Sequence, residues 1–270
     1  MIGKTTSSST TRSYMDKGVL KRYIVTPDKH APFHDKKAIK VLKKAIEIIK
    51  PDGYIDLGDF GEWGSVSHWQ WKKKKKPPLE YIIPRVDKDV EAGIALLDTI
   101  DESLDKANVK IKHMIQGNHD EWLDMFVEEH PYLPQYKFDK AMGLKDRGYK
   151  YHKAGDYFKI GKLHYYHGHH FGGQYHTANH LRRLGVSIMY GHWHGIQMMG
   201  TTSMSGPLEA WSIGCLKDMS KEKNKWLKGR PIDWAHAFAI VDYYPGGDFT
   251  VSLVRIIDGK ASLWGQELKA

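Results

Sequence analysis

The chain has little cysteine and no long apolar segment. Cys215 is the only cysteine among 270 residues, so no intrachain disulfide can form and a reducing compartment is expected. No apolar run approaches the roughly 18 residues that a membrane-spanning helix needs, and the first residues lack the apolar stretch of a signal peptide. We therefore expect a soluble, cytoplasmic protein with no membrane partner.

Acidic residues do not balance the basic ones in the N-terminal part of the chain. The formal net charge is +9, and the whole excess lies in residues 1–76, which hold 17 Lys and Arg against 8 Asp and Glu. Five of these cations are consecutive, from Lys72 to Lys76. Such a localised patch favours an anionic partner, although a charged tail and a solvated loop would have the same composition.

The sequence has no internal repeat and no linker that would divide it. With 41% hydrophobic residues it can bury a sizeable core. A Ser- and Thr-rich stretch without apolar periodicity predicts a disordered tail over 1–17. We expect a single domain over 18–270, with a basic and aromatic insert at 60–78.

In the first half, apolar runs alternate between strand lengths and helical periods. Short runs at 23–25, 54–57 and 110–115 predict buried strands. Apolar residues at helical spacing predict helices over 35–50 and 79–107 between them. This alternation is the pattern of a parallel sheet with crossover helices.

The second half is richer in strands, and its one predicted helix covers 175–184. The predicted strands are 157–160, 163–166, 186–190, 208–213, 238–243, 250–257 and 261–266. Two strand-rich halves predict an α/β fold of four layers. In this αββα sandwich, two mixed sheets pack face to face and helices cover their outer faces.

Five short polar segments each follow one of the predicted strands. They are Asp28-Lys29-His30, Gly58-Asp59, Gly117-Asn118-His119-Asp120, Tyr166-His167-Gly168 and Gly191-His192-Trp193-His194. Ligands of such sheets gather at the carboxyl ends of the strands, so we expect these segments to meet.

The side chains of these segments indicate a metal site. Oxygen and imidazole donors without thiolate suit Mn, Fe or Zn, and two such ions side by side suit phosphoester hydrolysis. Asp28 and His30 are one residue apart, so both can reach one ion, and the two oxygens of Asp59 can bridge two ions. A single histidine at a strand end is an ordinary turn residue, and only the set is informative.

In this order the segments resemble the motifs D-x-H, GD, GNHD, HG and GHxH of the calcineurin-like metallophosphoesterase superfamily, over about residues 21–195. The resemblance implies two divalent ions that share one carboxylate. One ion would be held by Asp28, His30, Asp59 and His194, and the other by Asp59, Asn118, His167 and His192. We expect Mn, with Fe, Zn or Ni as alternatives. The resemblance also implies the four-layer fold and hydrolysis by a hydroxide that the two ions activate.

Several histidines crowd the fourth segment. His167 follows the apolar strand and precedes Gly168, which favours it as the ligand. His164, His169 and His170 are the alternatives, because a register shift of a residue or two would bring one of them to the same place.

The same resemblance makes His119 the group that protonates the leaving oxygen or stabilises charge in the transition state. A histidine in this role needs a carboxylate partner to fix its tautomer. Related Ser/Thr phosphatases have Asp and Arg where this chain has Glu62 and Trp63. Glu62 or Asp120 is therefore expected to orient His119, and the missing Arg argues against a phosphoprotein phosphatase.

The insert determines the expected substrate. Aromatic faces for bases, beside lysines for phosphates, suit single-stranded nucleic acid. The residues expected to bind it are His68, Trp69, Trp71, Lys72, Lys73, Lys74, Lys75 and Lys76. The chain also resembles the compact phage and bacterial members of the superfamily often labelled DNA-repair phosphoesterases. We expect a phosphodiesterase or nuclease acting on nucleic acid or nucleotides, either cellular or phage-encoded and active in the host cytoplasm.

Two other functions fit the sequence. A small-molecule phosphomonoesterase or cyclic phosphodiesterase would use the same metal site, with the tryptophans in the core and the lysines in solvent. A non-catalytic protein-binding scaffold would have lost ligands or His119, whereas this chain retains them all. The sequence does not indicate an oligomeric state.

Overall fold

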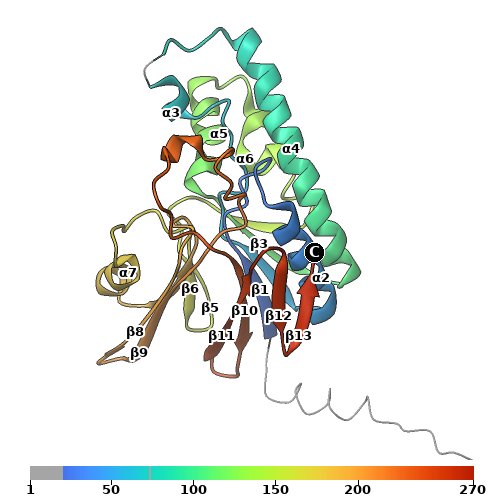
Figure 1. Cartoon of the computed structure of the whole chain (residues 1–270). Helices are drawn as coiled ribbons and strands as arrows, with labels where there is room; N and C mark the ends of the chain where they lie inside the picture. Colours follow the sequence, from blue (N-terminus) through green and yellow to red (C-terminus); the bar gives the residue numbers. More distant parts are fainter. Residues whose placement is uncertain (1–20, 73) are drawn as a thin grey trace, which may run out of the picture.

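Three buried cores separate four layers in the computed structural model, which describes residues 21–72 and 74–270. Figure 1 shows the layers from right to left as helices α2 and α4, a first sheet, a second sheet and helix α7. The predicted αββα sandwich of two mixed sheets is therefore confirmed. The tail predicted over 1–17 lies outside the described residues, as does Lys73.

The first sheet contains strands from both ends of the chain, in the order β11-β10-β1-β2-β3-β4. Its strands are β1 (Lys21–Thr26), β2 (Gly53–Asp56), β3 (Ile111–Ile115), β4 (Tyr149–His152), β10 (His236–Tyr243) and β11 (Phe249–Ile256). β1 to β4 are parallel, whereas β10 is antiparallel to both its neighbours. Alternate residues face opposite cores: Ile24 lies under the helices, and Tyr23 and Val25 lie between the sheets.

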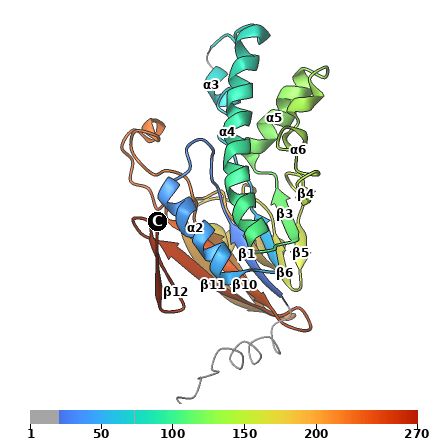
Figure 2. The ribbon, with the colours of Figure 1, turned by 90° about the vertical axis from the view of Figure 1, so that its right-hand side faces the viewer.

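Helices cover the outer face of this sheet (Figure 2). They are α2 (Lys36–Ile49), α4 (Leu79–Lys106), α5 (Asn118–Glu129) and α6 (Phe138–Ala141). Helix α2 begins after Asp35, whose carboxylate accepts a 2.7 Å hydrogen bond from the backbone nitrogen of Ala38, and ends before a left-handed Lys50. Of the helices in the described ranges, none combines the length and apolar character needed to cross a membrane.

The second sheet has five strands in the order β5-β6-β7-β9-β8. They are β5 (Phe158–Ile160), β6 (Leu163–Tyr165), β7 (Ser187–Tyr190), β8 (Ile196–Ser203) and β9 (Gly206–Ile213). Met189 faces the first sheet, whereas its neighbour Ile188 packs with Leu181 of α7 (His176–Leu184) on the outside. The two faces of β7 thus belong to two different cores.

Several elements differ from the prediction. The single strand predicted at 261–266 is wrong, because β12 (Lys260–Leu263) and β13 (Gln266–Lys269) form a hairpin around a left-handed turn at Trp264 and Gly265. Strands β4 and β8 and helix α5 were not predicted. Most of β8 is exposed on both faces, so it has no alternation of apolar and polar residues to recognise. The insert contains a short helix, α3 (His68–Trp71), and two 3-10 turns occur at Pro134–Tyr136 and Lys225–Leu227.

Candidate metal centre

Loops at the carboxyl ends of β1, β2, β3, β6 and β7 meet at one place and bring all seven predicted ligands together. Their donor atoms form two clusters, Asp28 with His30 and His194, and Asp59 with His167 and His192. Asn118 joins the second cluster, because its Oδ1 lies 2.9 Å from Nε2 of His167. The predicted ligands therefore form two neighbouring groups of metal donors, and a third possible group, His30 with Glu62 and His119, adjoins them.

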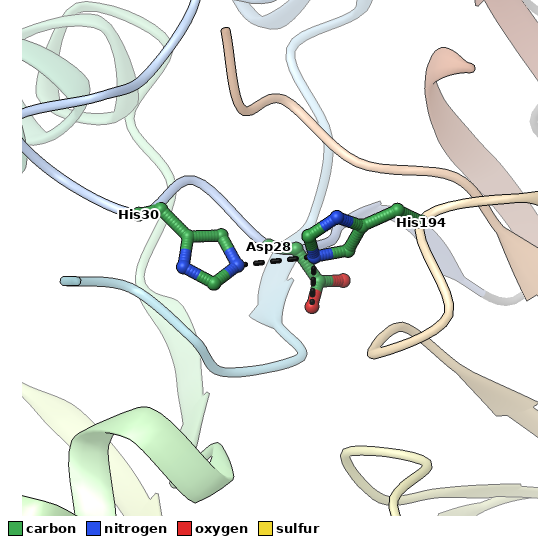
Figure 3. A group of neighbouring side chains, drawn as sticks. All are labelled: Asp28, His30 and His194. Atoms are coloured by element: carbon green, nitrogen blue, oxygen red, sulfur yellow. Dashed lines mark hydrogen bonds and ion pairs between the residues drawn. The ribbon is translucent and has the colours of Figure 1, made fainter. Parts of the chain in front are cut away.

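The first cluster is shown in Figure 3. The rings of His30 and His194 face each other with their Nε2 atoms 3.0 Å apart, and Nε2 of His194 lies 3.6 Å from Oδ1 of Asp28. All three side chains are buried. Two imidazole nitrogens and a carboxylate in this arrangement are a common donor set for Mn, Fe or Zn.

In the second cluster, several polar atoms converge on Nε2 of His167. Nδ1 of His167 lies 2.9 Å from the carbonyl oxygen of Leu57, so Nδ1 carries a proton and, in the neutral ring, Nε2 presents a lone pair. That lone pair lies 2.9 Å from Oδ1 of Asn118, 3.2 Å from Nδ1 of His192 and 3.3 Å from Oδ2 of Asp59. A cation at their centre would satisfy all four atoms, so the residues present fit a metal ion.

Asp59 lies between the clusters. Its Oδ2 is 3.3 Å from Nε2 of His167 and 3.7 Å from Nε2 of His30, and its Oδ1 accepts a 2.8 Å hydrogen bond from the backbone nitrogen of His119. One carboxylate therefore contacts both donor groups. This is the position that the predicted bridging ligand requires.

The backbone is left-handed at five of the seven predicted ligands. Asp28, His30, Asp59, His192 and His194 have φ values between 26° and 65°. Residues other than glycine are rare in this region, and strain of this kind is concentrated at functional sites.

Close backbone packing explains two of the neighbouring glycines. A Cβ atom at Gly117 would lie 2.2 Å from Oδ1 of Asp59, and one at Gly191 would lie 2.1 Å from Oδ2 of Asp28. Any larger residue at either position would displace a ligand carboxylate.

A buried ion pair holds the first two ligand loops together. Nζ of Lys29, which stands between two ligands in the sequence, lies 2.5 Å from Oδ2 of Asp56 at the end of β2. The backbone nitrogens of Lys29 and His30 donate to the carbonyl oxygen of Asp59 at 3.0 and 2.9 Å. These bonds fix the two loops at the distance the donors need.

The pKa directions show where the site stabilises positive charge. Burial lowers the pKa of His167, but the neighbouring Asp59 outweighs it and raises the pKa to about 9. Burial lowers the pKa of His192 to about 2, with a further contribution from His167. Burial also holds the pKa of His30 well below its ordinary value. Without a metal ion, His167 therefore carries a positive charge beside Asp59, and a bound cation would take the place of the proton on Nε2.

His119 stands beside the donors rather than among the seven. Its ring packs edge-on to His30 with centroids 4.7 Å apart and lies over Trp122 at 4.0 Å. Its Nδ1 lies 3.2 Å from the backbone carbonyl oxygen of Glu62, which can only accept, so Nδ1 carries the proton.

Among the described residues, no carboxylate is hydrogen-bonded to His119, so the role expected of Glu62 or Asp120 stays a prediction, although a Glu62 carboxylate oxygen lies within 4.8 Å of a ring nitrogen of His119. The Glu62 side chain instead lies 2.9 Å from Nδ1 of His30 and 2.7 Å from Nζ of Lys217. The backbone carbonyl oxygen of Glu62 orients the His119 ring, and the Glu62 carboxylate contacts the predicted metal ligand His30. The pKa of Glu62 is lowered because His30 and Lys217 outweigh the effect of burial.

Asp120 has a different task. Its buried carboxylate accepts hydrogen bonds from the backbone nitrogens of Phe60, Gly61 and Gly117 and from Nε1 of Trp63 at 2.7 Å. Burial and the charge of Asp59 raise its pKa to about 7. Asp120 therefore caps α5 and ties the loop after β2 to it.

A cavity of about 730 Å³ opens beside the donors. It is lined by His30, Asp59, His119, His192 and His194 together with Lys217 and five tryptophans, Trp69, Trp122, Trp193, Trp226 and Trp234. Of the predicted stacking residues, Trp69 reaches this cavity and is 61% exposed. Trp71 and His68 line a separate small pocket, where Nε1 of Trp71 donates to the carbonyl oxygen of Ser65 at 3.1 Å.

Of the described lysines in the predicted patch, Lys72 and Lys76 contact other side chains. Nζ of Lys72 lies 4.6 Å from the centre of the Trp69 ring, and Nζ of Lys76 lies 2.5 Å from Glu129. Lys74 and Lys75 are exposed. Of the described lysines in this patch, Lys72 contacts a residue that lines the metal-site cavity, Trp69.

The sequence did not identify Lys217, Trp122, Trp193, Trp226 or Trp234 as residues of the site. A signal existed for Trp226, which stands in the basic segment Lys221-Glu222-Lys223-Asn224-Lys225-Trp226-Leu227-Lys228-Gly229-Arg230. This composition matches that of the insert. Trp193 lies inside the segment Gly191-His192-Trp193-His194, between two ligands, whereas Lys217, Trp122 and Trp234 have no comparable signal in the sequence.

No family model matches the sequence. Two phage proteins are similar to it over most of their length. The Gene 54 protein of Mycobacterium phage D29 is 26% identical over 261 residues, which cover 91% of this chain and 97% of the relative. The Gene 54 protein of Mycobacterium phage L5 is 26% identical over 262 residues, which cover 91% and 98%.

Several solved structures are also similar. Vps29 of Chaetomium thermophilum has 10% identity and a TM-score of 0.46, with 92% of this chain and 96% of the other covered. A dimetal phosphatase from Danio rerio has 12% identity and a TM-score of 0.45, with 88% and 96% covered. Yfce, a phosphoesterase from E. coli, has 13% identity and a TM-score of 0.39, with 86% and 98% covered.

Proposed function

We propose that this chain is a binuclear metallophosphoesterase of the calcineurin-like superfamily, with Mn as its expected metal. One observation carries the proposal. Seven residues from five strand ends form two donor groups that share Asp59, and five of the seven lie in left-handed backbone. A structural role would not require this strained convergence of acceptors in a buried place.

The side chains have distinct tasks in this reaction. Bound divalent ions would supply a nucleophile from water at neutral pH and neutralise charge on the phosphoryl oxygens. His119 lines the cavity beside the donors, with Nδ1–H held by the Glu62 carbonyl oxygen. In its imidazolium form it would give the proton on Nε2 to the leaving oxygen and remain as the neutral ring with Nδ1–H. Lys217 places a cation in the same cavity, 2.7 Å from Glu62.

We further propose that the substrate is a phosphodiester of nucleic acid or a nucleotide. Support comes from Trp69, which reaches the cavity as an exposed ring with Lys72 beside it. An aromatic face for a base and a cation for a phosphate are the elements of single-strand binding. The volume of the cavity, about 730 Å³, also fits a single small molecule, so a small-molecule phosphomonoesterase or cyclic phosphodiesterase is the second candidate.

A metal-by-substrate screen tests both proposals. The purified chain would be loaded with Mn, Fe, Zn or Ni and supplied with bis-aryl phosphate, mono-aryl phosphate, cyclic nucleotides, and single- and double-stranded DNA. Metal-dependent hydrolysis of bis-aryl phosphate, exceeding that of the monoester, is expected. Metal binding without turnover of any phosphoester would exclude the enzyme and favour a scaffold.

Charge removal tests the nucleic-acid substrate separately. Replacing Lys72, Lys74 and Lys75 by Gln should raise KM for single-stranded DNA and reduce the slope of binding against salt by about 0.7 for each phosphate that is no longer neutralised. Hydrolysis of a small diester should be unchanged, since these side chains are exposed outside the cavity lining. An unchanged salt slope would make the small-molecule enzyme the better proposal.

A further inference from the structure

A second basic and aromatic segment faces the metal donors. Residues 218–234 run past the same end of the molecule as α3 and are the orange segment of Figures 1 and 2. Trp226 and Trp234 from this segment line the cavity together with Trp69, although Trp69 and Trp226 are separated by more than half of the chain.

The rings of this segment are organised around the first metal cluster. The Trp234 ring packs edge-on to His194 with centroids 4.4 Å apart, and Trp226 lies beyond it at 6.1 Å from Trp234. Trp193, which stands between two ligands in the sequence, lines the same cavity and is fixed by stacking on His176 at 5.2 Å. The cavity therefore has one aromatic wall attached to His194 and another formed by α3.

A smaller cavity shares three tryptophans with this one. Trp193, Trp226 and Trp234 also line a space of about 270 Å³, which Arg230 borders. A guanidinium beside aromatic faces is suited to a phosphate next to a stacked base.

Exposure distinguishes the two outermost rings. Trp69 is 61% exposed and Trp226 is 57% exposed, whereas Trp122, which supports His119, is buried. Large aromatic rings left in solvent on both sides of a polar site indicate surfaces that a ligand covers.

The charge of the segment has the sign that a polyanion needs. Residues 218–234 carry Lys221, Lys223, Lys225, Lys228 and Arg230 against three acidic residues. Lys223 lies over the Phe33 ring at 5.3 Å, and the described side chains of the other cations make no ion pair. These cations are therefore available to phosphates.

We propose that residues 218–234 form a second stacking wall, so that a single strand of nucleic acid lies across the metal centre with one base on Trp69 and another on Trp226. The inference rests on the proposed phosphodiesterase function and specifies its substrate. A strand held on both sides of the scissile phosphate is a diester by necessity. Duplex DNA, whose bases are stacked within the helix, would not engage both walls.

The second stacking wall is tested by the binding of a fluorescent oligothymidylate, which fluorescence anisotropy measures in the presence of Mn. All variants carry His119→Ala as well, because this change limits hydrolysis of the probe. Trp226→Ala should weaken binding about 5- to 150-fold, the range for loss of one base stack. Trp226→Tyr should recover most of the affinity, because a tyrosine still stacks. Trp264→Ala is the matched control, since Trp264 is 61% exposed in the β12–β13 turn, away from the cavity lining.

A second variant covers the case in which Trp226→Ala does not fold. Replacing Lys225, Lys228 and Arg230 by Gln leaves the rings in place and should flatten the salt dependence of binding by about 0.7 for each phosphate left without a cation. Binding by Trp226→Ala within twofold of the parent, or an unchanged salt slope in the charge variant, would overturn the proposal. Tighter binding of duplex than of single strand would also overturn it.

Two different measurements test the second stacking wall and the proposed phosphoesterase function, so either can fail without the other. Hydrolysis of bis-aryl phosphate by the unaltered chain reports the metal chemistry, whereas oligonucleotide anisotropy reports the walls. Hydrolysis with unchanged binding by Trp226→Ala would keep the phosphoesterase and remove the second wall. No hydrolysis with weakened binding would keep the wall and remove the phosphoesterase.

Discussion

The metal centre and the aromatic cavity walls lie next to each other but are built differently. The metal donors sit two to four residues beyond the ends of regular strands, at positions that parallel pairing fixes. The two outermost tryptophans lie on a four-residue helix, α3, and on a 3-10 turn at Lys225–Leu227. The first region is positioned by the sheets, and the second by irregular chain that packs over them.

Under the proposed function, the donors would carry the chemistry and the cavity walls would carry substrate recognition. Strand ends hold atoms to within the narrow distances that metal binding requires, whereas irregular segments can change without disturbing the sheets. Changes in the donors should therefore abolish activity on every substrate. Changes in the walls should alter which substrate is bound.

The largest expected effect follows from the shared carboxylate. Asp59→Asn should lower occupancy at both ion positions and nearly abolish hydrolysis of all phosphoesters, because this carboxylate contacts both donor groups. Elemental analysis of protein purified with Mn should give about two ions per chain before the change. Asp28→Asn is the matched control and should affect mainly one position. Equal losses from the two variants would show that the clusters are not joined through Asp59.

A smaller loss is expected at His119. His119→Ala should retain both metals and reduce hydrolysis about 10²- to 10⁴-fold, the usual contribution of a general acid. The loss should shrink for substrates with very good leaving groups, which need no proton. The measurement is kcat/KM across aryl diesters of graded leaving-group pKa, with metal content determined in parallel. A uniform loss across the series would indicate charge stabilisation instead of proton transfer.

Changes at the two tryptophans of α3 should affect different properties, nucleic-acid binding for Trp69 and thermal stability for Trp71. Trp69→Ala should weaken single-strand binding about 5- to 150-fold with little change in thermal stability, since its ring is exposed in the cavity. Trp71→Ala should mainly lower the melting temperature, because Trp71 packs in a separate pocket and donates to Ser65. Anisotropy and thermal unfolding measured on both variants would distinguish them. Reversed results would place the stacking surface at Trp71.

The smallest effect concerns histidines outside both regions. Burial lowers the pKa of His113 and of His152 to about 4, and their rings contact through Nδ1 and Nε2 at 2.9 Å. A histidine in the unfolded chain has a pKa near 6.5, so between pH 6.5 and 4 the unfolded state binds protons that the folded state does not. The free energy of unfolding is therefore highest above pH 6.5 and decreases as the pH falls toward 4.

His152→Gln keeps a polar partner for His113 and removes one titrating group. Between pH 6 and 4.5, it should reduce the slope of the unfolding free energy by about 1.4 kcal/mol per pH unit. Urea titrations at several pH values would measure this slope, with the values above pH 7 as the reference. An unchanged slope would mean that His152 is protonated in the folded state as well.

The strands that lead into the metal donors could be predicted because each has a local pattern, whereas helix α5, which begins at Asn118, was not predicted. Ala38 and Leu42 recur at helical spacing and are buried in α2, and the apolar runs before Asp28 and Asp59 are buried strands. Strand β8 could not be predicted, since its side chains are mostly exposed and nothing in its composition marks a strand.

The candidate donors could be named from short local motifs and the family they resemble, because D-x-H, GD, GNHD, HG and GHxH each combine a polar side chain with the strand end that positions it. The surroundings of these donors depend instead on how the chain folds in three dimensions. Folding turns the Glu62 carboxylate toward His30 and Lys217, and buries Asp120 under the loop after β2. It also brings Trp226 to the same cavity as Trp69. These contacts join residues far apart in the chain, so no local spacing could encode them, and the packing of two sheets and their loops was needed to create them.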